Sequence, residues 1–502
     1  MLTVGRLLER LDILSIAGSV RQAQEIGSLV CDSREVVAGC LFIAVRGFVT
    51  DGHRFIDRAV EGGASVVICE ELPGATGEDC LYVVVGDSRK ARALAAAAFY
   101  GDPAERLNII GVTGTNGKTT TARLMAAMFN DCGIRAGYIG TGLATVGEET
   151  VPLERTTPEA EELHRLFMLM AERGCRAVVM EVSSHALVLE RTFGIRFTGA
   201  VFTNLTPEHL DFHRDMDRYA EAKRLLFRSL DPEGFAVLNA DDPRAAFMAE
   251  AFCGKRLIRC SLDSGLSAPD SGRETVGAVV TAADMSGTRL SVHAGGRSYE
   301  TLFRLPGRYN VMNLLEVFAS GIAMGIAAER VLAALGNVRP VEGRMEVVGK
   351  GAKGGCTVVD YAHTPDALEK VLETLDELKP EGAWLIVVFG CGGNRDREKR
   401  PEMGRIASAR AKRVIVTSDN PRNEDPERIM DEITAGIRSA GYLRFSDRVE
   451  AIRCGVNLMH PEDVLLVAGK GHEKYQEKCG ARTYFSDQET ARAAMLARER
   501  MR

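Results

Sequence analysis

The sequence predicts an α/β protein made of three domains. With 502 residues, the chain is too long for a single hydrophobic core. Short apolar runs alternate with helical patterns over most of its length, as in mostly parallel sheets covered by helices. Breaks rich in glycine and proline at 101–103 and around Pro340 interrupt this pattern. We therefore expect an N-terminal small α/β domain over residues 1–103, a central domain with a parallel sheet and appended antiparallel strands over 104–339, and a C-terminal Rossmann-like α/β domain over 340–502.

Composition and charge argue against nucleic-acid and membrane partners. The formal net charge is −6, so no overall positive field draws the protein to nucleic acid or to an anionic membrane. The N-terminal segment places charged side chains among leucines, unlike a secretion signal, and no apolar run is long enough to cross a bilayer. The 12 cysteines are scattered without a Cys-x-x-Cys pair, which indicates reduced thiols. We expect a cytoplasmic protein without membrane insertion.

In the N-terminal domain, apolar runs and helical patterns alternate in the order strand, helix, strand, strand, helix. They lie at 40–45, 55–61, 64–69, 81–85 and 91–100. Asp32, Ser33 and Arg34 follow a short apolar run and precede a turn at Gly39, so their side chains lie at a strand end. A surface turn and a ligand-binding site are equally compatible with this position.

The most informative stretch is a glycine-rich loop between an apolar run and a helical pattern that covers 119–132. Glycines let backbone N–H groups approach an anion, the helix N-terminus adds its dipole, and Lys118 supplies a mobile positive charge. Thr119 would offer its hydroxyl to Mg²⁺. The candidate ATP-binding residues of this loop are Gly114, Thr115, Asn116, Gly117, Lys118, Thr119 and Thr120.

This loop departs from the general P-loop pattern at one position. Val112 stands where that pattern has a glycine, and the nearest glycine is Gly111. A glycine-rich turn without a ligand is the alternative, but Gly-Lys-Thr directly after a strand favours a purine nucleoside triphosphate. We therefore expect the central domain to be P-loop ATPase-like.

A carboxylate and an imidazole follow two further strands of the central domain. One buried strand ends at Glu181, where open α/β sheets bind ligands, so Glu181 is a candidate ligand of Mg²⁺. The alternative is that Ser183 or Ser184 caps a helix and that Glu181 is incidental. His209 and His213 are four residues apart, as in zinc sites, but no third ligand pattern follows. A single His209 beside a magnesium site and a structural histidine both remain open.

The rest of the central domain offers fewer chemical signals. A helix over 219–230 carries Lys223, which by composition is a solvated helix lysine. Alternating residues over 264–303 predict an antiparallel hairpin layer. Asn310 and Asn313 lie one turn apart at the start of an apolar helix. Their amides could cap this helix or contact a base, and a cap is the default interpretation.

In the C-terminal domain, Arg395, Arg422 and Glu473 come after the ends of three apolar strands. Two guanidinium groups and one carboxylate at one edge of a sheet suit a zwitterion that carries carboxylates and an amine. Solvated charges in turns are the alternative. The glycines that begin at Gly390 fail the G-x-G-x-x-G spacing, which argues against a nicotinamide cofactor.

Taken together, the motifs resemble those of the Mur ligases, ATP-dependent enzymes that build the peptide stem of bacterial cell-wall precursors. The resemblance spans nearly the whole chain. It rests on Gly-Val-Thr-Gly-Thr-Asn-Gly-Lys-Thr-Thr from Gly111, Glu-Val-Ser-Ser-His from Glu181, Thr-Asn-Leu from Thr203, His-Leu-Asp from His209, Tyr-Ala-Glu-Ala-Lys from Tyr219, Asn-Val-Met-Asn from Asn310, Gly-Arg-Met-Glu from Gly343 and Asp-Tyr-Ala-His-Thr-Pro from Asp360. Asp-Asn-Pro-Arg from Asp419 is similar to the motif of members that add meso-2,6-diaminopimelate rather than lysine.

The resemblance implies an ATP-dependent acid–amino-acid ligase of peptidoglycan synthesis. Its expected substrates are ATP, UDP-N-acetylmuramoyl-L-alanyl-D-glutamate and meso-2,6-diaminopimelate. The amino acid would be joined to the D-glutamyl γ-carboxylate through an acyl phosphate. Two Mg²⁺ ions and a CO₂-derived carbamate on Lys223 are implied as well, and we expect a monomer.

The resemblance also implies roles for individual residues. The catalytic residues would be Lys118, Glu181, His209 and Lys223, and the metal ligands Thr119, Glu181, His209 and carbamylated Lys223. The loop would hold ATP together with Asn310, Arg344 and Asp360. The UDP-substrate would contact Ser33, Thr156, Thr157, Ser183 and Arg191, with Phe48, Val49 and Thr50 at the uridine. Diaminopimelate would contact Arg395, Asp419, Asn420, Pro421, Arg422, Gly469 and Glu473.

Three positions depart from the family pattern. Leu189 stands where many members have glutamine, Glu208 where an aspartate is common, and Phe48-Val49 where the pair is more polar. These departures concern the details of UDP-substrate contacts rather than the reaction. Three alternatives stay open: the same ligase adding L-lysine or L-ornithine, a ligase like folylpolyglutamate synthetase, and a P-loop switch protein without ligase activity.

Overall fold

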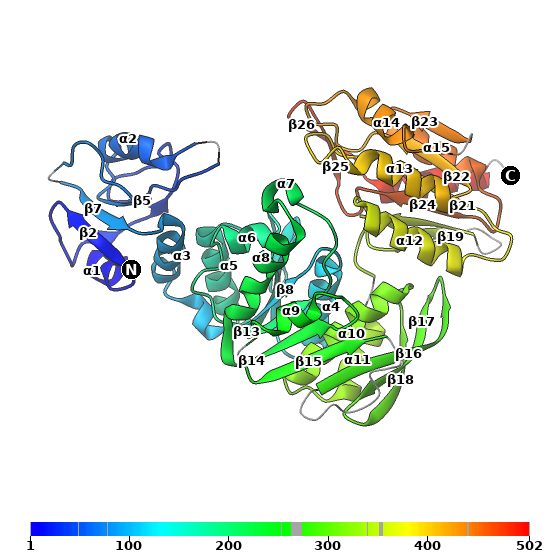
Figure 1. Cartoon of the computed structure of the whole chain (residues 1–502), viewed down its shortest axis with the longest axis horizontal. Helices are drawn as coiled ribbons and strands as arrows, with labels where there is room; N and C mark the ends of the chain where they lie inside the picture. The colour runs from blue at the N-terminus through cyan, green and yellow to red at the C-terminus, as the bar shows by residue number, and fades with distance from the viewer. Residues whose placement is uncertain are drawn as a thin grey trace.

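The computed structural model describes residues 2–48, 50–77, 79–252, 254–262, 274–338, 340–350, 355–438 and 441–500. Three α/β units, each built on its own main sheet, follow one another along the chain (Figure 1). The expected fold class is therefore confirmed. Val49, expected at the uridine, and the start of the run predicted as a hairpin layer lie outside the described residues.

The N-terminal unit is a small sheet with helices packed against it. Its strand order is β2-β7-β6-β5-β4, in which β4 to β7 are parallel and β2 is antiparallel at one edge. The strands are β2 (Ile13–Ala17), β4 (Leu29–Val30), β5 (Leu41–Ile43), β6 (Val66–Cys69) and β7 (Leu81–Val85), and the helices are α1 (Val4–Leu8), α2 (Ile56–Glu61) and α3 (Ser88–Phe99). A separate pair, β1 (Leu2–Thr3) and β3 (Glu25–Ile26), and the 3-10 helix η1 (Gly52–Phe55) complete the unit.

The central unit is an 11-stranded sheet of order β11-β10-β9-β12-β8-β13-β14-β15-β16-β17-β18. Neighbours from β9 to β16 are parallel, and antiparallel strands extend both edges. Its strands are β8 (Asn108–Thr113), β9 (Ala136–Gly140), β10 (Leu143–Val146), β11 (Glu149–Pro152), β12 (Ala177–Glu181), β13 (Phe197–Phe202), β14 (Leu230–Asn239), β15 (Arg256–Ser261), β16 (Glu274–Asp284), β17 (Gly287–Ala294) and β18 (Arg297–Phe303). The predicted antiparallel strands after 264 are present and continue the parallel sheet, whereas the β10–β11 hairpin at the other edge was not predicted.

Helices cover both faces of this sheet because its strands alternate apolar side chains between the two faces. Ile110 and Val112 of β8 pack with α4, α10 and α11, while Ile109 packs with α5, α6, α8 and α9. The helices are η2 (Pro103–Arg106), α4 (Lys118–Asp131), α5 (Ala160–Glu172), α6 (Ser184–Val188), α7 (Leu210–His213), α8 (Met216–Arg228), α9 (Ala245–Ala249), α10 (Arg308–Ala323) and α11 (Ala328–Asn337).

The C-terminal unit is a six-stranded sheet of order β19-β20-β24-β21-β22-β23, parallel except for β19. Helices α12, α13 and α14 cover one face, and α15 and α16 cover the other. The elements are β19 (Glu346–Lys350), β20 (Cys356–Asp360), α12 (Pro365–Leu378), β21 (Leu385–Phe389), α13 (Lys399–Arg410), β22 (Arg413–Thr417), α14 (Pro426–Thr434), β23 (Tyr442–Phe445), α15 (Arg448–Leu458), β24 (Val464–Ala468), β25 (Tyr475–Lys478), β26 (Ala481–Tyr484) and α16 (Asp487–Arg500). The short hairpin of β25 and β26 was not predicted.

Polar side chains connect neighbouring units. Arg92 of α3 donates to Glu161 of α5 over 2.8 Å, which joins the N-terminal and central units. Asn116, in the glycine-rich loop, donates through Nδ2 to Asp366 of α12 over 2.7 Å. The predicted phosphate loop therefore lies where the central unit contacts the C-terminal unit.

The structure bears on two further sequence predictions. Within the described ranges, no helix combines the length and apolar character needed to cross a membrane. The described cysteines are free thiols and most of them are buried, as their scattered positions predicted.

Candidate active site

The glycine-rich loop connects the end of β8 to the first turn of α4 and requires its glycines. Gly114 and Gly117 have φ angles of 150° and 86°, a region that favours glycine. A Cβ atom at Gly114 would lie 1.9 Å from Thr203 Oγ1, and one at Gly117 would lie 2.7 Å from Asn313 Oδ1. The loop is thus pressed against β13 and α10, and the free N–H groups of the first turn of α4 can meet an anion.

Lys118 folds back over this loop. Its Nζ donates to the carbonyl oxygens of Gly114 and Thr115 over 2.9 and 2.7 Å. Burial lowers the pKa of the Lys118 amine. A phosphate group bound at the loop would place a negative charge next to this amine. That charge would favour the protonated form of Lys118.

Glu181, the last residue of β12, is completely buried and accepts hydrogen bonds on both carboxylate oxygens. Tyr138 Oη and the Thr141 N–H donate to Oε1 over 2.7 and 2.9 Å, and Thr119 Oγ1 donates to Oε2 over 2.9 Å. Ser183 caps α6, as the alternative interpretation of this stretch expected. Glu181 stays a candidate ligand, because the hydroxyl of Thr119 and a carboxylate side by side are the oxygen ligands that Mg²⁺ prefers.

Lys223 lies on the buried face of α8, so the sequence-based expectation of a solvated lysine is wrong. Its side chain is 1% exposed, and Nζ donates to the carbonyl oxygen of Gly114 over 2.7 Å. The amine lies 4.5 Å from the centroid of the Tyr219 ring. Burial and the charge of Lys118 lower the pKa of Lys223 well below its usual range. Periodicity could have revealed this position, because Tyr219 and Phe227, one turn away on either side, are buried as well.

His209 precedes α7, and His213 is the last residue of that helix. His209 Nε2 lies 3.7 Å from Glu208, one of the positions that depart from the family pattern. Glu208 in turn lies 3.9 Å from Nε2 of His363 in the C-terminal unit. His213 is buried and its Nε2 lies 2.9 Å from Ser184 Oγ, so the four-residue spacing is structural rather than that of a zinc site.

Two of the expected ATP-binding residues lie in the C-terminal unit, and one of them, Arg344, reaches the loop. Arg344 donates through Nη2 to Thr119 Oγ1 over 3.2 Å and lies 4.5 Å from the centroid of the Tyr361 ring. Asp360 ends β20 and accepts the backbone N–H groups of Met345 and Ala362 over 2.7 and 2.8 Å. Burial raises the pKa of Asp360.

Asn310 and Asn313 do not cap α10, so the default interpretation of these residues is wrong. The helix begins after Gly307 without a side-chain cap. Asn310 Nδ2 donates to the carbonyl oxygen of Pro306 over 2.7 Å, and its Oδ1 accepts Asn313 Nδ2 over 3.2 Å. Both ends of the Asn310 amide are thus engaged inside the protein, and it is Asn313 that contacts the loop at Gly117.

Four of the expected UDP-substrate residues form one connected group next to Glu181. Thr157 Oγ1 donates to the carbonyl oxygen of Glu181 over 2.9 Å and accepts the N–H of Ser183 over 3.0 Å. Arg191 Nη1 donates to the carbonyl oxygen of Thr157 over 3.1 Å. Thr156 Oγ1 lies 3.1 Å from Thr141 Oγ1.

The remaining expected residues of this group lie on the N-terminal unit. Ser33 is half-buried in the loop after β4. Phe48 is 74% exposed, and its ring lies 5.7 Å from that of Phe212 in the central unit. Thr50 is exposed, and Leu189 is half-buried at the end of α6. Phe48 and Phe212 thus face each other between the two units.

Arg395 and Arg422 come together at the glycine-rich stretch after β21. A Cβ atom at Gly392 would lie 3.0 Å from Arg422 Nη1 and 3.7 Å from Arg395 Cγ. Arg422 has a φ angle of 51° and donates through Nη1 to the carbonyl oxygen of Gly393 over 2.8 Å. Pro421 also packs closely here, because a Cβ atom at Gly393 would lie 1.9 Å from its carbonyl oxygen. Arg395 and Arg422 thus start from the same sheet edge, and the binding site made by their guanidinium groups stays a prediction.

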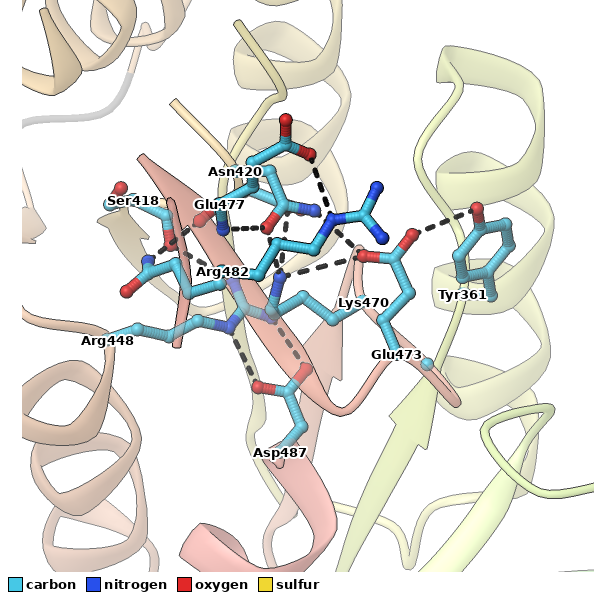
Figure 2. Close-up of polar contacts among 12 residues, drawn as sticks. Tyr361, Ser418, Asn420, Arg448, Lys470, Glu473, Glu477, Arg482 and Asp487 are labelled. Carbon is cyan, nitrogen blue, oxygen red and sulfur yellow. Dashed lines mark hydrogen bonds and ion pairs between the residues drawn. The ribbon is translucent and has the colours of Figure 1, made fainter. Parts of the chain in front are cut away.

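The carboxylate of Glu473 lies at this edge, next to Asn420, Lys470 and Tyr361 (Figure 2). Glu473 Oε2 accepts Asn420 Nδ2 over 2.8 Å, and Oε1 lies 3.4 Å from Tyr361 Oη. A Cβ atom at Gly469 would lie 2.7 Å from Asp419 Oδ2, so the loops after β22 and β24 are in contact. Burial and the neighbouring Asp419 raise the pKa of Glu473.

Residues that the sequence did not predict hold this edge together. Arg422 is paired through its backbone with the unpredicted β25–β26 hairpin, since its N–H donates to the carbonyl oxygen of Glu477 over 3.0 Å. Gln476 Nε2 donates to the carbonyl oxygen of Asp419 over 2.7 Å. Lys470, inside the Gly-Lys-Gly-His-Glu run, is completely buried. A lysine between two glycines at a strand end was the available signal.

The fold and the site define a phosphate-loop protein of three α/β units, in which a loop for an anion faces a charged sheet edge. Family models match three successive stretches. They are the Mur ligase family catalytic domain at 25–88, the Mur ligase middle domain at 112–321 and the Mur ligase glutamate ligase domain at 343–471. The chain belongs to the Mur ligase family.

Similar proteins cover nearly the full length of the chain. UDP-N-acetylmuramoyl-L-alanyl-D-glutamate--2,6-diaminopimelate ligase of Chlorobaculum tepidum is 55% identical over 468 residues, which are 93% of this chain and 92% of that protein. The ligase of the same name from Chlorobium phaeobacteroides is 53% identical over 497 residues, 98% of this chain and 97% of that protein. A solved structure of a ligase with this name is 32% identical with a TM-score of 0.69 and covers 99% of each chain.

Proposed function

We propose that this chain is an ATP-dependent ligase that joins meso-2,6-diaminopimelate to the D-glutamyl γ-carboxylate of UDP-N-acetylmuramoyl-L-alanyl-D-glutamate in peptidoglycan precursor synthesis. One observation carries the proposal. The phosphate loop contacts the C-terminal unit through Asn116 with Asp366 and through Thr119 with Arg344, over 2.7 and 3.2 Å. A phosphoryl group held at the loop and an amine held by the C-terminal unit can therefore meet at one site. The names of the similar ligases agree with this reaction.

The reaction would proceed through an acyl phosphate. The γ-phosphoryl group of ATP is transferred to an oxygen of the substrate carboxylate, and ADP leaves. The neutral amine of diaminopimelate then attacks the carbonyl carbon of the acyl phosphate. Phosphate leaves with one oxygen of the former carboxylate, and the nitrogen loses a proton as the amide forms. Phosphorylation supplies the leaving group that a carboxylate lacks, so the protein's contribution is charge neutralisation and alignment.

In this proposal the phosphate loop and its neighbours hold ATP. Lys118 neutralises the phosphoryl group, and the first turn of α4 donates N–H groups to it. Arg344 of the C-terminal unit adds a second positive charge at the loop. Asp360 and Asn310 stay candidates for ATP contacts, with the Asn310 amide engaged by Pro306 in this structure.

Thr119, Glu181, His209 and a carbamylated Lys223 would hold two Mg²⁺ ions. When bound, these ions neutralise the phosphates of ATP. The donor set fits, because the hydroxyl of Thr119 lies 2.9 Å from Glu181 Oε2 and both are oxygen ligands. Among the residues that the structure describes, no group of three or more His, Cys, Asp and Glu side chains could hold a metal ion. A carbamate on Lys223 supplies the further carboxylate that this set lacks.

The substrates that donate the carboxylate and the amine would bind on either side of the loop. Thr156, Thr157, Ser183 and Arg191, with Ser33 and the Phe48 region of the N-terminal unit, would contact the UDP-substrate. Arg395 and Arg422 would bind carboxylates of diaminopimelate, and Glu473 would accept its ammonium group, with Asp419, Asn420, Pro421 and Gly469 shaping the pocket. A planar guanidinium fork at Arg422 can grip the second carboxylate that lysine lacks.

The domain boundaries near 103 and 340 would serve as hinges in this reaction. Gly101 and Gly343 have φ angles of 74° and 69° at these two connections. Closure would bring the three substrates together and exclude water from the acyl phosphate. We also propose that the enzyme is cytoplasmic and monomeric.

The test is phosphate release from Mg-ATP in the presence and absence of each of the other two substrates. We expect release only when both the UDP-linked acceptor and diaminopimelate are present. Phosphate release in the absence of both substrates would favour a P-loop switch protein. Release that requires a folate acceptor instead would favour a ligase like folylpolyglutamate synthetase.

A further inference from the structure

A buried ammonium group lies beneath the expected amino-acid site. The side chain of Lys470 is 0% exposed, and its Nζ donates to Asn420 Oδ1 over 2.8 Å (Figure 2). Asp419 Oδ1 and Glu473 Oε2 each lie 3.6 Å from the same nitrogen. A buried charge is costly unless it is paired and hydrogen-bonded, so these three side chains must stay close to Lys470 in the folded protein.

Lys470 determines which way the amide of Asn420 points. Asn420 Oδ1 accepts both Lys470 Nζ and the N–H of Glu477, the latter over 3.0 Å. A flipped amide would turn its own NH₂ group against these two donors. Asn420 Nδ2 is therefore directed to Glu473 Oε2, which it reaches over 2.8 Å. Within the described part of the chain, the other oxygen, Oε1, has only the long contact of 3.4 Å with Tyr361 and can receive a further donor.

The two loops that meet at Lys470 start from one fixed base. Arg448, the first residue of α15, donates to the carbonyl oxygens of Ala468 and Ser418 over 2.9 and 3.5 Å. Its charge is balanced by Asp487, which accepts two hydrogen bonds over 2.8 and 2.7 Å, and both side chains are 0% exposed. Figure 2 shows Asp487 below Arg448, and Lys470 on the side of Arg448 that faces Asn420. Arg448 holds the starts of both loops. The contacts of Lys470 then fix the side chains of Asn420 and Glu473, which these loops carry.

We propose that Lys470 is a positioning residue for the amino-acid substrate, which fixes Asn420 and Glu473 so that Glu473 Oε1 receives an ammonium group of a diamino dicarboxylic acid. Lys470 acts through these two residues and does not touch the substrate, because its side chain is buried. The inference rests on the proposed function and deepens it. It concerns the binding of one substrate and predicts no effect on ATP or on the UDP-linked acceptor.

Steady-state kinetics of Lys470→Met test the inference. We expect KM for meso-diaminopimelate to rise by about tenfold or more, with kcat at saturating diaminopimelate and the KM values for ATP and the UDP-linked acceptor within about threefold of the wild type. Asp463→Asn is the matched control. Asp463 is buried at the opposite edge of the same sheet and accepts the N–H of Trp384, so this variant should leave all KM values unchanged. A folded Lys470→Met enzyme with an unchanged KM for diaminopimelate would overturn the inference.

The pH dependence separates a positioning role from a general structural one. The charged and titratable groups that face Glu473 are Asp419, Lys470, Arg422, Arg448, Tyr361 and Tyr475. Removal of the Lys470 charge raises the pKa of Glu473 further. We therefore expect the acidic limb of kcat/KM for diaminopimelate to move to higher pH in Lys470→Met, while the limb measured for ATP stays in place. A limb that does not move contradicts the proposed role.

A second variant keeps the test usable if Lys470→Met does not fold. Lys470→Gln retains a donor for Asn420 but lacks the charge, so we expect an intermediate KM for diaminopimelate and a shift of the acidic limb. Wild-type values for this variant would overturn the inference. A wild-type enzyme that does not turn over diaminopimelate would instead refute the proposed function, which distinguishes the two failures.

Discussion

The side-chain amines of Lys118 and Lys223 donate to the same acceptor, the carbonyl oxygen of Gly114, over 2.9 and 2.7 Å. Lys118 opens α4 and Lys223 lies in the middle of α8, so the two helices bring like charges together at the phosphate loop. Burial and the charge of Lys118 lower the pKa of Lys223 well below its usual range. The amine of Lys223 is therefore neutral at pH values where an exposed lysine is charged.

A neutral amine can add CO₂, and we expect Lys223 to be carbamylated at neutral pH. The measurement is a ¹³C NMR spectrum of the protein in ¹³C-bicarbonate, which should show a carbamate signal that disappears in Lys223→Met. Lys255→Met is the control, because Lys255 is an exposed lysine of the same unit, paired with Glu233. A wild-type spectrum without a carbamate signal would contradict the assignment.

Lys118→Ala should stop phosphoryl transfer and leave UDP-substrate binding intact. The variant removes the mobile positive charge of the phosphate loop, and loss of one such electrostatic contact costs on the order of a hundredfold or more in rate. Phosphate release measures the first effect, and calorimetric titration with the UDP-linked acceptor measures the second. Full turnover by Lys118→Ala would refute the role of the loop, and Lys255→Ala should behave as the wild type.

Arg422→Ala should reduce discrimination between meso-diaminopimelate and L-lysine. Loss of a charge-assisted pair with the second carboxylate costs about 2–3 kcal/mol, which corresponds to roughly a hundredfold in the ratio of kcat/KM values. Arg428→Ala is the control, since this arginine of α14 is 67% exposed and pairs with Glu432 at the surface. An unchanged ratio in Arg422→Ala would count against the assignment.

His164 should make the protein less stable in acid. It is 2% exposed on α5, neither of its ring nitrogens has a hydrogen-bond partner among the described residues, and burial lowers its pKa from 6.5 to about 4. Because the folded-state pKa lies below the unfolded value, the unfolded state binds the proton first, and stability is lost as pH falls from about 6.5 toward about 4.

Replacing His164 by leucine removes this contribution to the loss of stability in acid. Between about pH 7 and about pH 4.5, His164→Leu should lose roughly 2 kcal/mol less free energy of unfolding than the wild type. Denaturant titrations at the two pH values measure the difference. His293→Leu, at an exposed position of β17, should keep the wild-type pH dependence, and an equal loss in all three proteins would contradict the explanation.

The parallel strands could be predicted because both of their faces are buried. Continuous apolar runs such as 66–69, 177–180 and 464–468 are completely buried in the structure. The β10–β11 hairpin lies at a sheet edge and β25–β26 form a separate two-stranded sheet, and the residues of both are largely polar or half-exposed. Such short strands carry little hydrophobic pattern, so propensity alone does not find them.

Site residues at strand ends could be found from the sequence, whereas helical ones could not be found from composition. Glu181 ends a buried strand of the central sheet, whereas Arg422 and Glu473 follow buried strands of the C-terminal sheet, and parallel topology brings the strand ends of each sheet to one edge. Lys223 looks like any helix lysine until its neighbours on the same face are counted. Lys470 lies at a strand end, but its burial depends on contacts with Asn420 and Glu473, which come from the fold as a whole.

The central claim concerns the amine that the enzyme joins to its acceptor. The direct measurement is mass spectrometry of the product formed from Mg-ATP and UDP-N-acetylmuramoyl-L-alanyl-D-glutamate with equal amounts of meso-diaminopimelate, L-lysine and L-ornithine in one mixture. The site built by Arg395, Arg422 and Glu473 predicts that the diaminopimelate-containing tripeptide is the main product. A lysine- or ornithine-containing product would keep the ligase and refute the assignment of this site, and no product with any amine would contradict the proposed reaction itself.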